Sequence, residues 1–102
     1  MRGSRAYIPR INGEKPPMAS VTIYTKSWCP YCSAAKKLLG DKGAAFTEID
    51  IEAKPERRGE MIAKAAGRST VPQIFIGDRH VGGCDDLYAL DDNGTLQALL
   101  QS

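Results

Sequence analysis

The sequence predicts an α/β domain in which one central sheet is flanked by helices. Short runs of β-branched and aromatic residues, typical of strands, alternate along the chain with stretches whose apolar residues repeat at helical spacing. Gly, Pro and Asp mark the boundaries between these runs and give the order β-α-β-α-β-β-α. The third observation is a pair of thiols, Cys29 and Cys32, at the first strand-to-helix junction.

The first strand and the first helix meet at this pair of cysteines. Residues 21–25, Val-Thr-Ile-Tyr-Thr, alternate in the manner of a strand, and the apolar residues after Cys32 form the stripe of an amphipathic helix. Pro30 suits the first helical position because its φ is fixed and it has no N–H to leave unpaired. Cys29 is therefore predicted to be the N-cap residue of the helix.

The later elements follow from the same patterns. Gly40 and Gly43 flank the turn that ends the first helix. Pro55 opens the second helix and Gly67 stops it. The remaining expected elements are strands at 45–51, 71–76 and 79–81 and helices at 84–90 and 95–100.

Length and composition indicate a single small domain. A chain of 102 residues with 42% hydrophobic residues can bury one core, and no apolar run approaches the ~18 residues needed to span a bilayer. Residues 1–17 carry four Arg or Lys against one Glu, a formal +3, and lack both periodicity and the apolar centre of a secretory signal. We expect them to be a flexible leader left by expression. Residues 18–102, the expected domain, carry ten Lys or Arg against eleven Asp or Glu, a formal −1, which indicates no nucleic-acid partner.

Two thiols in a Cys-Pro-Tyr-Cys sequence predict reversible dithiol–disulfide chemistry. At the N-cap, the sulfur of Cys29 would face the unpaired N–H groups of Tyr31 and Cys32 and the positive end of the helix, which stabilise a thiolate. Lys26 adds a positive charge nearby, so the pKa of Cys29 is expected to lie well below ~8.5, the value of free cysteine. Cys32 lies within the first turn, where its sulfur is more shielded. Cys29 is therefore predicted to attack and Cys32 to resolve.

The cysteine pair has two alternative interpretations. It is also half of a zinc site, and His80 and Cys84 form a His-X3-Cys that could supply the other half. The long separation of the two halves, and a Pro-Tyr insert unlike the small turn-forming pair of zinc knuckles, argue against zinc. A structural disulfide is disfavoured because three cysteines is an odd number and nothing else indicates an oxidising compartment. We expect no metal, no membrane partner and a cytoplasmic location.

Three motifs in sequence order resemble the dithiol glutaredoxins of the small bacterial type. They are Tyr-Thr-Lys at 24–26 followed by Trp-Cys-Pro-Tyr-Cys at 28–32, Thr-Val-Pro at 70–72, and Gly-Gly-Cys-Asp-Asp at 82–86. The resemblance covers residues 18–102 and implies a thioredoxin-like fold with a central four-stranded mixed sheet. It also implies a glutathione-dependent oxidoreductase that reduces protein–glutathione mixed disulfides and some protein disulfides. Glutathione would be a co-substrate, and the protein would act as a monomer.

The resemblance also assigns site residues. The catalytic pair would be Cys29 and Cys32. The glutathione-binding residues would be Lys26, Tyr31, Thr70, Val71, Pro72, Gly83, Cys84, Asp85 and Asp86. Glutathione offers two carboxylates, an ammonium and a thiol, so cations, N–H donors and an anionic group suit its chemistry.

Several of these residues would have a distinct physical role. Lys26 would meet the glycyl carboxylate, as in the family. The bond before Pro72, cis in relatives, would turn the preceding N–H and C=O outward, where an extended peptide can pair with them like an added strand. N–H groups at the start of the helix after Gly83 would hold the γ-glutamyl carboxylate, while Asp85 or Asp86 takes the ammonium.

Other residues near the motifs have expected roles as well. Arg57 or Arg58 would add charge for the glycyl end, and the sequence does not choose between them. Trp28 is expected to pack beside the active corner, and His80 to be an ordinary strand residue. Cys84 is expected to line the glutathione groove rather than to react, although an exposed thiol there would be open to oxidation.

Two rival functions stay open. A thioredoxin-type reductase fed by a flavoprotein is disfavoured because the chain lacks an extra N-terminal β-α unit and encloses Pro-Tyr rather than Gly-Pro between its cysteines. In an iron–sulfur carrier, two chains would share a cluster through Cys29 and two glutathiones. Pro30 argues against that function, since cluster-binding relatives usually have a smaller residue there.

Overall fold

The computed structural model describes residues 19–101, so the leader expected at 1–17 lies outside the described residues. The elements are β1 (Val21–Thr25), α1 (Pro30–Asp41), β2 (Phe46–Asp50), the 3-10 helix η1 (Pro55–Arg57), α2 (Arg58–Lys64), β3 (Gln73–Ile76), β4 (Arg79–Gly82), α3 (Cys84–Asp92) and α4 (Thr95–Leu100). The predicted order of strands and helices is confirmed, with η1 inserted ahead of α2.

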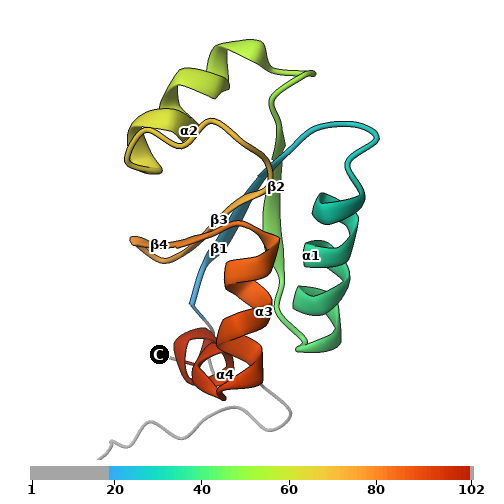
Figure 1. Ribbon diagram of the computed structural model, residues 1–102, viewed down its shortest axis with the longest axis vertical. Helices are drawn as coiled ribbons and strands as arrows, with labels where there is room; N and C mark the ends of the chain where they lie inside the picture. The colour runs from blue at the N-terminus through green and yellow to red at the C-terminus, as the bar shows by residue number, and fades with distance from the viewer. Residues whose placement is uncertain (1–18, 102) are drawn as a thin grey trace, which may run out of the picture.

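A four-stranded mixed sheet forms the centre of the domain, in the order β2-β1-β3-β4 (Figure 1). β1 and β2 run parallel, with Val21 opposite Phe46, so α1 has to cross over between them. β1 pairs with β3 in antiparallel fashion, and β3 pairs with β4 in the same way. The expected fold class, a four-stranded mixed sheet flanked by helices, is confirmed.

The strands alternate side chains between two apolar faces. One face packs against α1, α3 and α4, and α1 and α3 lie side by side on it (Figure 1). Its buried members are Val21, Ile23, Ala35, Leu38, Leu39, Ala44, Ile74, Ile76, Cys84, Leu87, Leu96 and Leu100. The other face packs against α2 through Tyr24, Ile49, Ile51, Met61, Ala65 and Phe75. β1 contributes to both clusters, so the strand that leads to the cysteines is held from both sides.

The chain around α2 differs from its prediction. Pro55–Arg57 form a 3-10 helix, and α2 ends at Lys64. Ala66 and Gly67 have positive φ values of 56° and 92°, so the chain leaves the helix in a left-handed turn. Gly67 thus belongs to the exit turn that follows α2.

The edges of the last strands and of α3 also shift. β3 begins at Gln73 rather than at residue 71, because Pro72 has no N–H to donate to the sheet. α3 runs to Asp92 rather than to residue 90. Only Gly83, the N-cap residue of α3, separates β4 from Cys84, and the start of α3 lies beside the start of α1, where Cys84 and Tyr31 line one pocket.

Candidate active site

Cys29 and Cys32 form a disulfide at the N-terminus of α1. Cys29 is the N-cap residue, and its sulfur accepts a hydrogen bond at 3.1 Å from the N–H of Cys32, one of the two predicted donors. Pro30 lies in the first turn, as predicted. Cys29 is half-buried, whereas Cys32 is only 2% exposed. Cys29 is therefore the member of the pair that an incoming disulfide can reach.

The disulfide borders a pocket of about 490 Å³ with charged walls. The carboxylate of Glu48 lies on one wall, where it accepts hydrogen bonds from the Thr25 hydroxyl at 2.7 Å and from Lys36 Nζ at 3.0 Å. These bonds, the one from Thr25 first, hold the pKa of Glu48 below its usual range. Lys26 lines the same pocket, is exposed, and has no ion-pair partner among residues 19–101. Its charge is available to an anion beside the cysteines.

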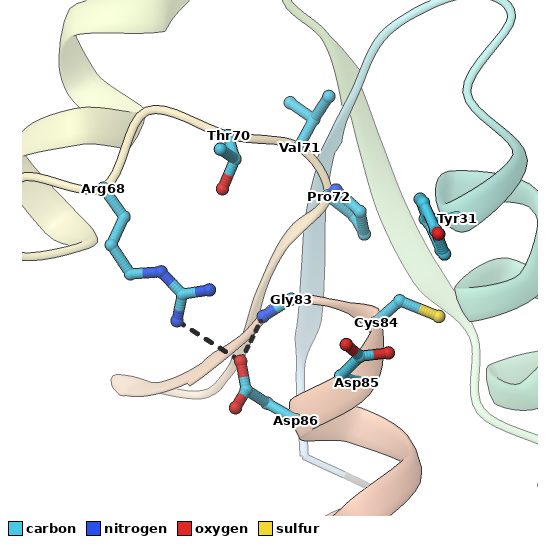
Figure 2. Close-up of a pocket in the computed structure, with 9 residues that line it drawn as sticks. All are labelled: Tyr31, Arg68, Thr70, Val71, Pro72, Gly83, Cys84, Asp85 and Asp86. Atoms are coloured by element: carbon cyan, nitrogen blue, oxygen red, sulfur yellow. Dashed lines mark hydrogen bonds and ion pairs between the residues drawn. The ribbon is translucent and has the colours of Figure 1, made fainter.

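A second pocket, of about 330 Å³, lies where three segments distant in sequence meet (Figure 2). The start of α1, the loop before β3 and the start of α3 form its wall. Its lining residues are Tyr31, Arg68, Thr70, Val71, Pro72, Gly83, Cys84, Asp85 and Asp86. Eight of the nine residues predicted to bind glutathione therefore line one pocket, and the ninth, Lys26, lines the pocket beside the disulfide.

The loop before β3 presents polar and apolar groups to this second pocket. The Val71–Pro72 peptide bond is cis, as expected from the resemblance. Thr70 is exposed, Val71 is half-buried and Pro72 is buried. Tyr31 is 64% exposed, and in Figure 2 it lies next to Pro72, across the view from Arg68. A ligand in the pocket would therefore meet an aromatic ring and an apolar edge as well as hydrogen-bonding groups.

The N-terminus of α3 is organised by Asp86. Its carboxylate accepts the N–H of Gly83, the N-cap residue, at 2.8 Å and pairs with Arg68 Nη1 at 3.3 Å. The bond from Gly83, followed by the charge and hydrogen bond of Arg68, lowers the pKa of Asp86. Gly82 has a φ of 115°, and a side chain there would overlap this carboxylate. Asp85 is exposed and has no ion-pair partner among the described residues, so its carboxylate is not committed to another side chain of the site.

Arg68 is the site residue that the sequence interpretation missed. It lines the second pocket, whereas Arg57 and Arg58 line neither pocket beside the cysteines. The guanidinium of Arg57 is instead bound to Glu60, at 2.7 and 2.8 Å. The one signal for Arg68 is its place two residues ahead of Thr70, which begins the Thr-Val-Pro motif.

Cys84 and Trp28 are the two remaining residues of the expected site. Cys84 is 7% exposed and belongs to the core while it lines the second pocket, so it is not the exposed, oxidisable thiol considered from the sequence. Burial, and then the charge of Asp85, raise the pKa of Cys84. Trp28 is 98% exposed, so the expectation that it packs beside the corner is wrong. Trp28 has a positive backbone φ of 57° and lies in the loop between β1 and α1.

The sequence offered a zinc site as an alternative interpretation of the cysteine pair, and it contained no apolar run long enough to span a bilayer. Within residues 19–101, His, Cys, Asp and Glu side chains form no group of three or more that could hold a metal ion. His80, half of the zinc alternative, is hydrogen-bonded through Nε2 to Gln73 at 2.7 Å. No helix in the same part of the chain is long and apolar enough to cross a membrane.

A redox-active Cys-X-X-Cys pair at the N-terminus of the first helix of a thioredoxin-like sheet defines a thiol–disulfide oxidoreductase. The glutaredoxin family model matches residues 21–81, and the chain belongs to the glutaredoxin family. It is 58% identical to glutaredoxin 3 of Escherichia coli K12 over 84 residues, which cover 82% of this chain and all of that protein.

Solved structures give the same family. The solution structure of a glutaredoxin from Brucella melitensis is similar, with a TM-score of 0.73 and 58% identity over 87% of this chain and 95% of that one. A buckwheat glutaredoxin–glutathione complex has a TM-score of 0.71 and 31% identity over 78% of this chain and 74% of that one. A structure described as "Metal Binding of Glutaredoxins" has a TM-score of 0.65 and 57% identity over 86% and 96% of the two chains.

Proposed function

We propose that this thiol–disulfide oxidoreductase uses glutathione to reduce protein–glutathione mixed disulfides and some protein disulfides. The observation that carries the proposal is the joint position of the cysteine pair and a pocket suited to a charged tripeptide. Tyr31 belongs to that pocket and lies between Cys29 and Cys32 in sequence. The buckwheat relative was solved as a glutathione complex, which supports the same ligand here.

The charges around the two pockets suit the two ends of glutathione. Lys26 would bind the glycyl carboxylate beside the disulfide. At the other end, backbone N–H groups in the first turn of α3, which follows Gly83, would hold the γ-glutamyl carboxylate. Asp85 would bind the ammonium, because the carboxylate of Asp86 already serves Gly83 and Arg68. Tyr31 and the loop before β3 would cover the middle of the tripeptide.

The first chemical step is a thiol–disulfide exchange at Cys29. The Cys29 thiolate attacks the glutathione sulfur of the mixed disulfide, the substrate S–S bond breaks, and a new S–S bond joins Cys29 to glutathione. The protein substrate leaves as a thiolate and takes a proton from solvent. The glutathione site sets this direction of attack, because it places the glutathione sulfur next to Cys29.

The second step returns the enzyme to its starting state. A second glutathione thiolate attacks the glutathione sulfur of the Cys29–glutathione disulfide, so that oxidised glutathione forms and Cys29 leaves as a thiolate. A low pKa makes Cys29 a good leaving group, at some cost in nucleophilicity. With a protein disulfide, Cys29 first binds the substrate covalently, and Cys32 then attacks Cys29 to release it. That route ends in the Cys29–Cys32 disulfide, which two glutathiones reduce.

The proposal extends to the setting in which the protein works. Residues 18–102 would form the active domain, and it would act as a monomer in the cytoplasm, where thiols are kept reduced.

A second candidate function is metal or cluster binding, favoured by the relative described as "Metal Binding of Glutaredoxins". Protein purified without air should be colourless under the first proposal. A brown protein containing iron and sulfide would support the second.

A comparison of two mixed disulfides tests the proposed function. One peptide carries glutathione on its cysteine, and the control carries free cysteine in the same bond. Reduced protein with Cys32→Ser should release the peptide thiol at least about 10-fold faster from the glutathionylated form, since charge-assisted hydrogen bonds are worth roughly 1.5–3 kcal/mol each. Equal rates, together with efficient reduction of the parent by a flavoprotein thioredoxin reductase, would replace the proposal with the thioredoxin-type alternative.

A further inference from the structure

A chain of hydrogen bonds leads from β4 to the pocket-lining loop. The amide nitrogen of Gln73, Nε2, lies 3.0 Å from the carbonyl oxygen of Thr70 and 3.2 Å from its hydroxyl. The amide oxygen of Gln73 lies 2.7 Å from Nε2 of His80. Gln73 is fully buried, so this amide has no water to replace a lost partner. None of the three motifs of the family resemblance contains Gln73 or His80.

The chemistry of the groups fixes the direction of each bond. A carbonyl oxygen can only accept, so the Gln73 side chain must turn its NH₂ group towards Thr70 and its oxygen towards His80. Nε2 of His80 must then carry a hydrogen. Both the Nε2–H neutral tautomer and the imidazolium meet that need. The chain of bonds therefore survives either protonation state of His80.

The bonds have a consequence for Thr70, which lines the second pocket. Both hydrogens of the Gln73 amide are given to Thr70, one to its carbonyl and one to its hydroxyl oxygen. With that oxygen already accepting, the hydroxyl hydrogen of Thr70 is free to point at a ligand. The same two bonds anchor the residue that precedes Val71 and Pro72 in the pocket wall.

His80 is itself held in place from two directions. Its ring stacks on Phe75, with centroids 4.9 Å apart and planes 26° apart. Burial, then the charge of Arg68, lower the pKa of His80, while the charge of Asp86 raises it. Both of these charged residues line the same pocket as Thr70. His80 therefore lies behind the pocket wall and does not enter the pocket.

We propose that Gln73 and His80 are positioning residues for glutathione recognition, which hold the Thr70 hydroxyl and its loop in the orientation that the tripeptide requires. This inference rests on the proposed function, because glutathione is the ligand that Thr70 would meet. It adds two residues that touch neither the ligand nor the sulfurs. Their removal should affect substrates that carry glutathione and leave the chemistry of Cys29 unchanged.

Four variants in the Cys32→Ser background test the proposal. Gln73→Leu removes the amide, His80→Phe removes the donor but keeps the stacking on Phe75, and His80→Gln keeps an N–H at similar reach. The fourth combines Gln73→Leu with His80→Phe. Gln97→Leu, at an exposed position on α4, is the matched control. For each protein, single-turnover release of the peptide thiol is measured with the glutathionylated and with the cysteinylated peptide. The rate at which iodoacetamide alkylates Cys29 reports the reactivity of its thiolate.

We expect Gln73→Leu and His80→Phe to slow release from the glutathionylated peptide by about 5–10-fold, the effect of roughly one lost hydrogen bond. The cysteinylated peptide and iodoacetamide should react at the parental rate. His80→Gln should stay within about twofold of the parent, and the double variant should be no slower than Gln73→Leu alone, because the residues act in series. Gln97→Leu should behave like the parent.

Two results would overturn the proposal. One is a parental rate with the glutathionylated peptide in both Gln73→Leu and His80→Phe. The other is an equal loss with both peptides and with iodoacetamide, which would mean that the whole corner has been disturbed. If Gln73→Leu fails to fold, the two substitutions at half-buried His80 decide alone. A parent that does not distinguish the two peptides would instead contradict the proposed function, whatever the variants do.

Discussion

At the scale of single residues, the two cysteines of one disulfide have different surroundings. Cys29 is half-buried at the N-cap, and its sulfur accepts an N–H of the first turn, whereas Cys32 is buried. The accessible sulfur is thus also the one that the helix end favours as an anion. This difference supports separate roles for the two thiols.

Substitution of each cysteine should separate these roles. Cys29→Ser should abolish every activity, because the other two described thiols, Cys32 and Cys84, are buried. Cys32→Ser should keep the removal of glutathione from a peptide and lose the reduction of protein disulfides, which needs the resolving thiol. Both are measured with glutathione as the reductant. An equal loss of deglutathionylation in the two variants would contradict the assignment.

The acidity of Cys29 gives a second test at this scale. In the reduced protein its thiolate should form well below pH ~8.5, because N–H groups of the first turn and the charge of Lys26 favour the anion. Ultraviolet absorbance of the thiolate against pH measures this titration. Lys26→Ala should raise the pKa of Cys29, whereas Lys37→Ala should not, because the partner of Lys37 is Asp41 at the C-terminal end of α1. An unshifted titration in the parent would contradict the role of the helix end.

At the scale of elements, the start of α3 uses its two acidic residues differently. Asp86 is a structural cap, since it binds the N–H of Gly83 and pairs with Arg68. Asp85 is exposed beside it and faces the same pocket. The sequence left Asp85 and Asp86 as alternative ligands for the ammonium, and in the structure only Asp86 is already bound to other groups of the protein.

Alanine at each position should expose this division. Asp85→Ala should raise the KM for the glutathionylated peptide by roughly 3–10-fold through the lost ammonium contact, with the free energy of unfolding close to that of the parent. Asp86→Ala should lower the free energy of unfolding by about 1 kcal/mol, the usual effect of a lost N-cap contact. Urea titrations and steady-state kinetics on both proteins check the pair. The opposite pattern would make Asp86 the ammonium ligand.

A second contact between elements joins β1 to α2. The Tyr24 hydroxyl donates to Glu60, and the guanidinium of Arg57 binds both oxygens of the same carboxylate. The hydrogen bonds from Arg57 first, and then from Tyr24, lower the pKa of Glu60 to about 2. Burial, and then the bond to Glu60, raise the pKa of Tyr24 to about 12. This cluster closes the face of the sheet that α2 covers.

The cluster should make the fold sensitive to acid in a defined range. The pKa of Glu60 is lower in the folded protein than in the unfolded chain, so its stabilisation is present above pH ~4.5 and lost as the pH falls towards 2. Between these pH values the free energy of unfolding should fall by about 1–2 kcal/mol less in Glu60→Gln than in the parent, after allowance for solvent screening. Glu56→Gln, on exposed η1, is the control. Urea unfolding at a series of pH values measures it, and identical acid curves for parent and Glu60→Gln would contradict the role of the cluster.

At the scale of the whole molecule, the sequence predicted what local patterns determine. Pro30 fixed the start of α1 and placed Cys29 at its N-cap, and the family resemblance indicated the cis bond before Pro72. Arg68 and the exposure of Trp28 were not predictable, because both depend on how distant segments meet or part in three dimensions. The buried contact of Gln73 with His80 joins two strands and has no signature in either one alone.

Glutathione-directed exchange requires that Cys29 attack the glutathione sulfur of the mixed disulfide rather than the sulfur of the protein substrate. Reduced protein with Cys32→Ser is mixed with an equal amount of glutathionylated peptide, without free glutathione, and is quenched in acid for mass spectrometry. The expected product is one glutathionyl group on Cys29, mapped by digestion, together with an equal amount of free peptide thiol. A disulfide between Cys29 and the peptide, with glutathione set free, would contradict the account.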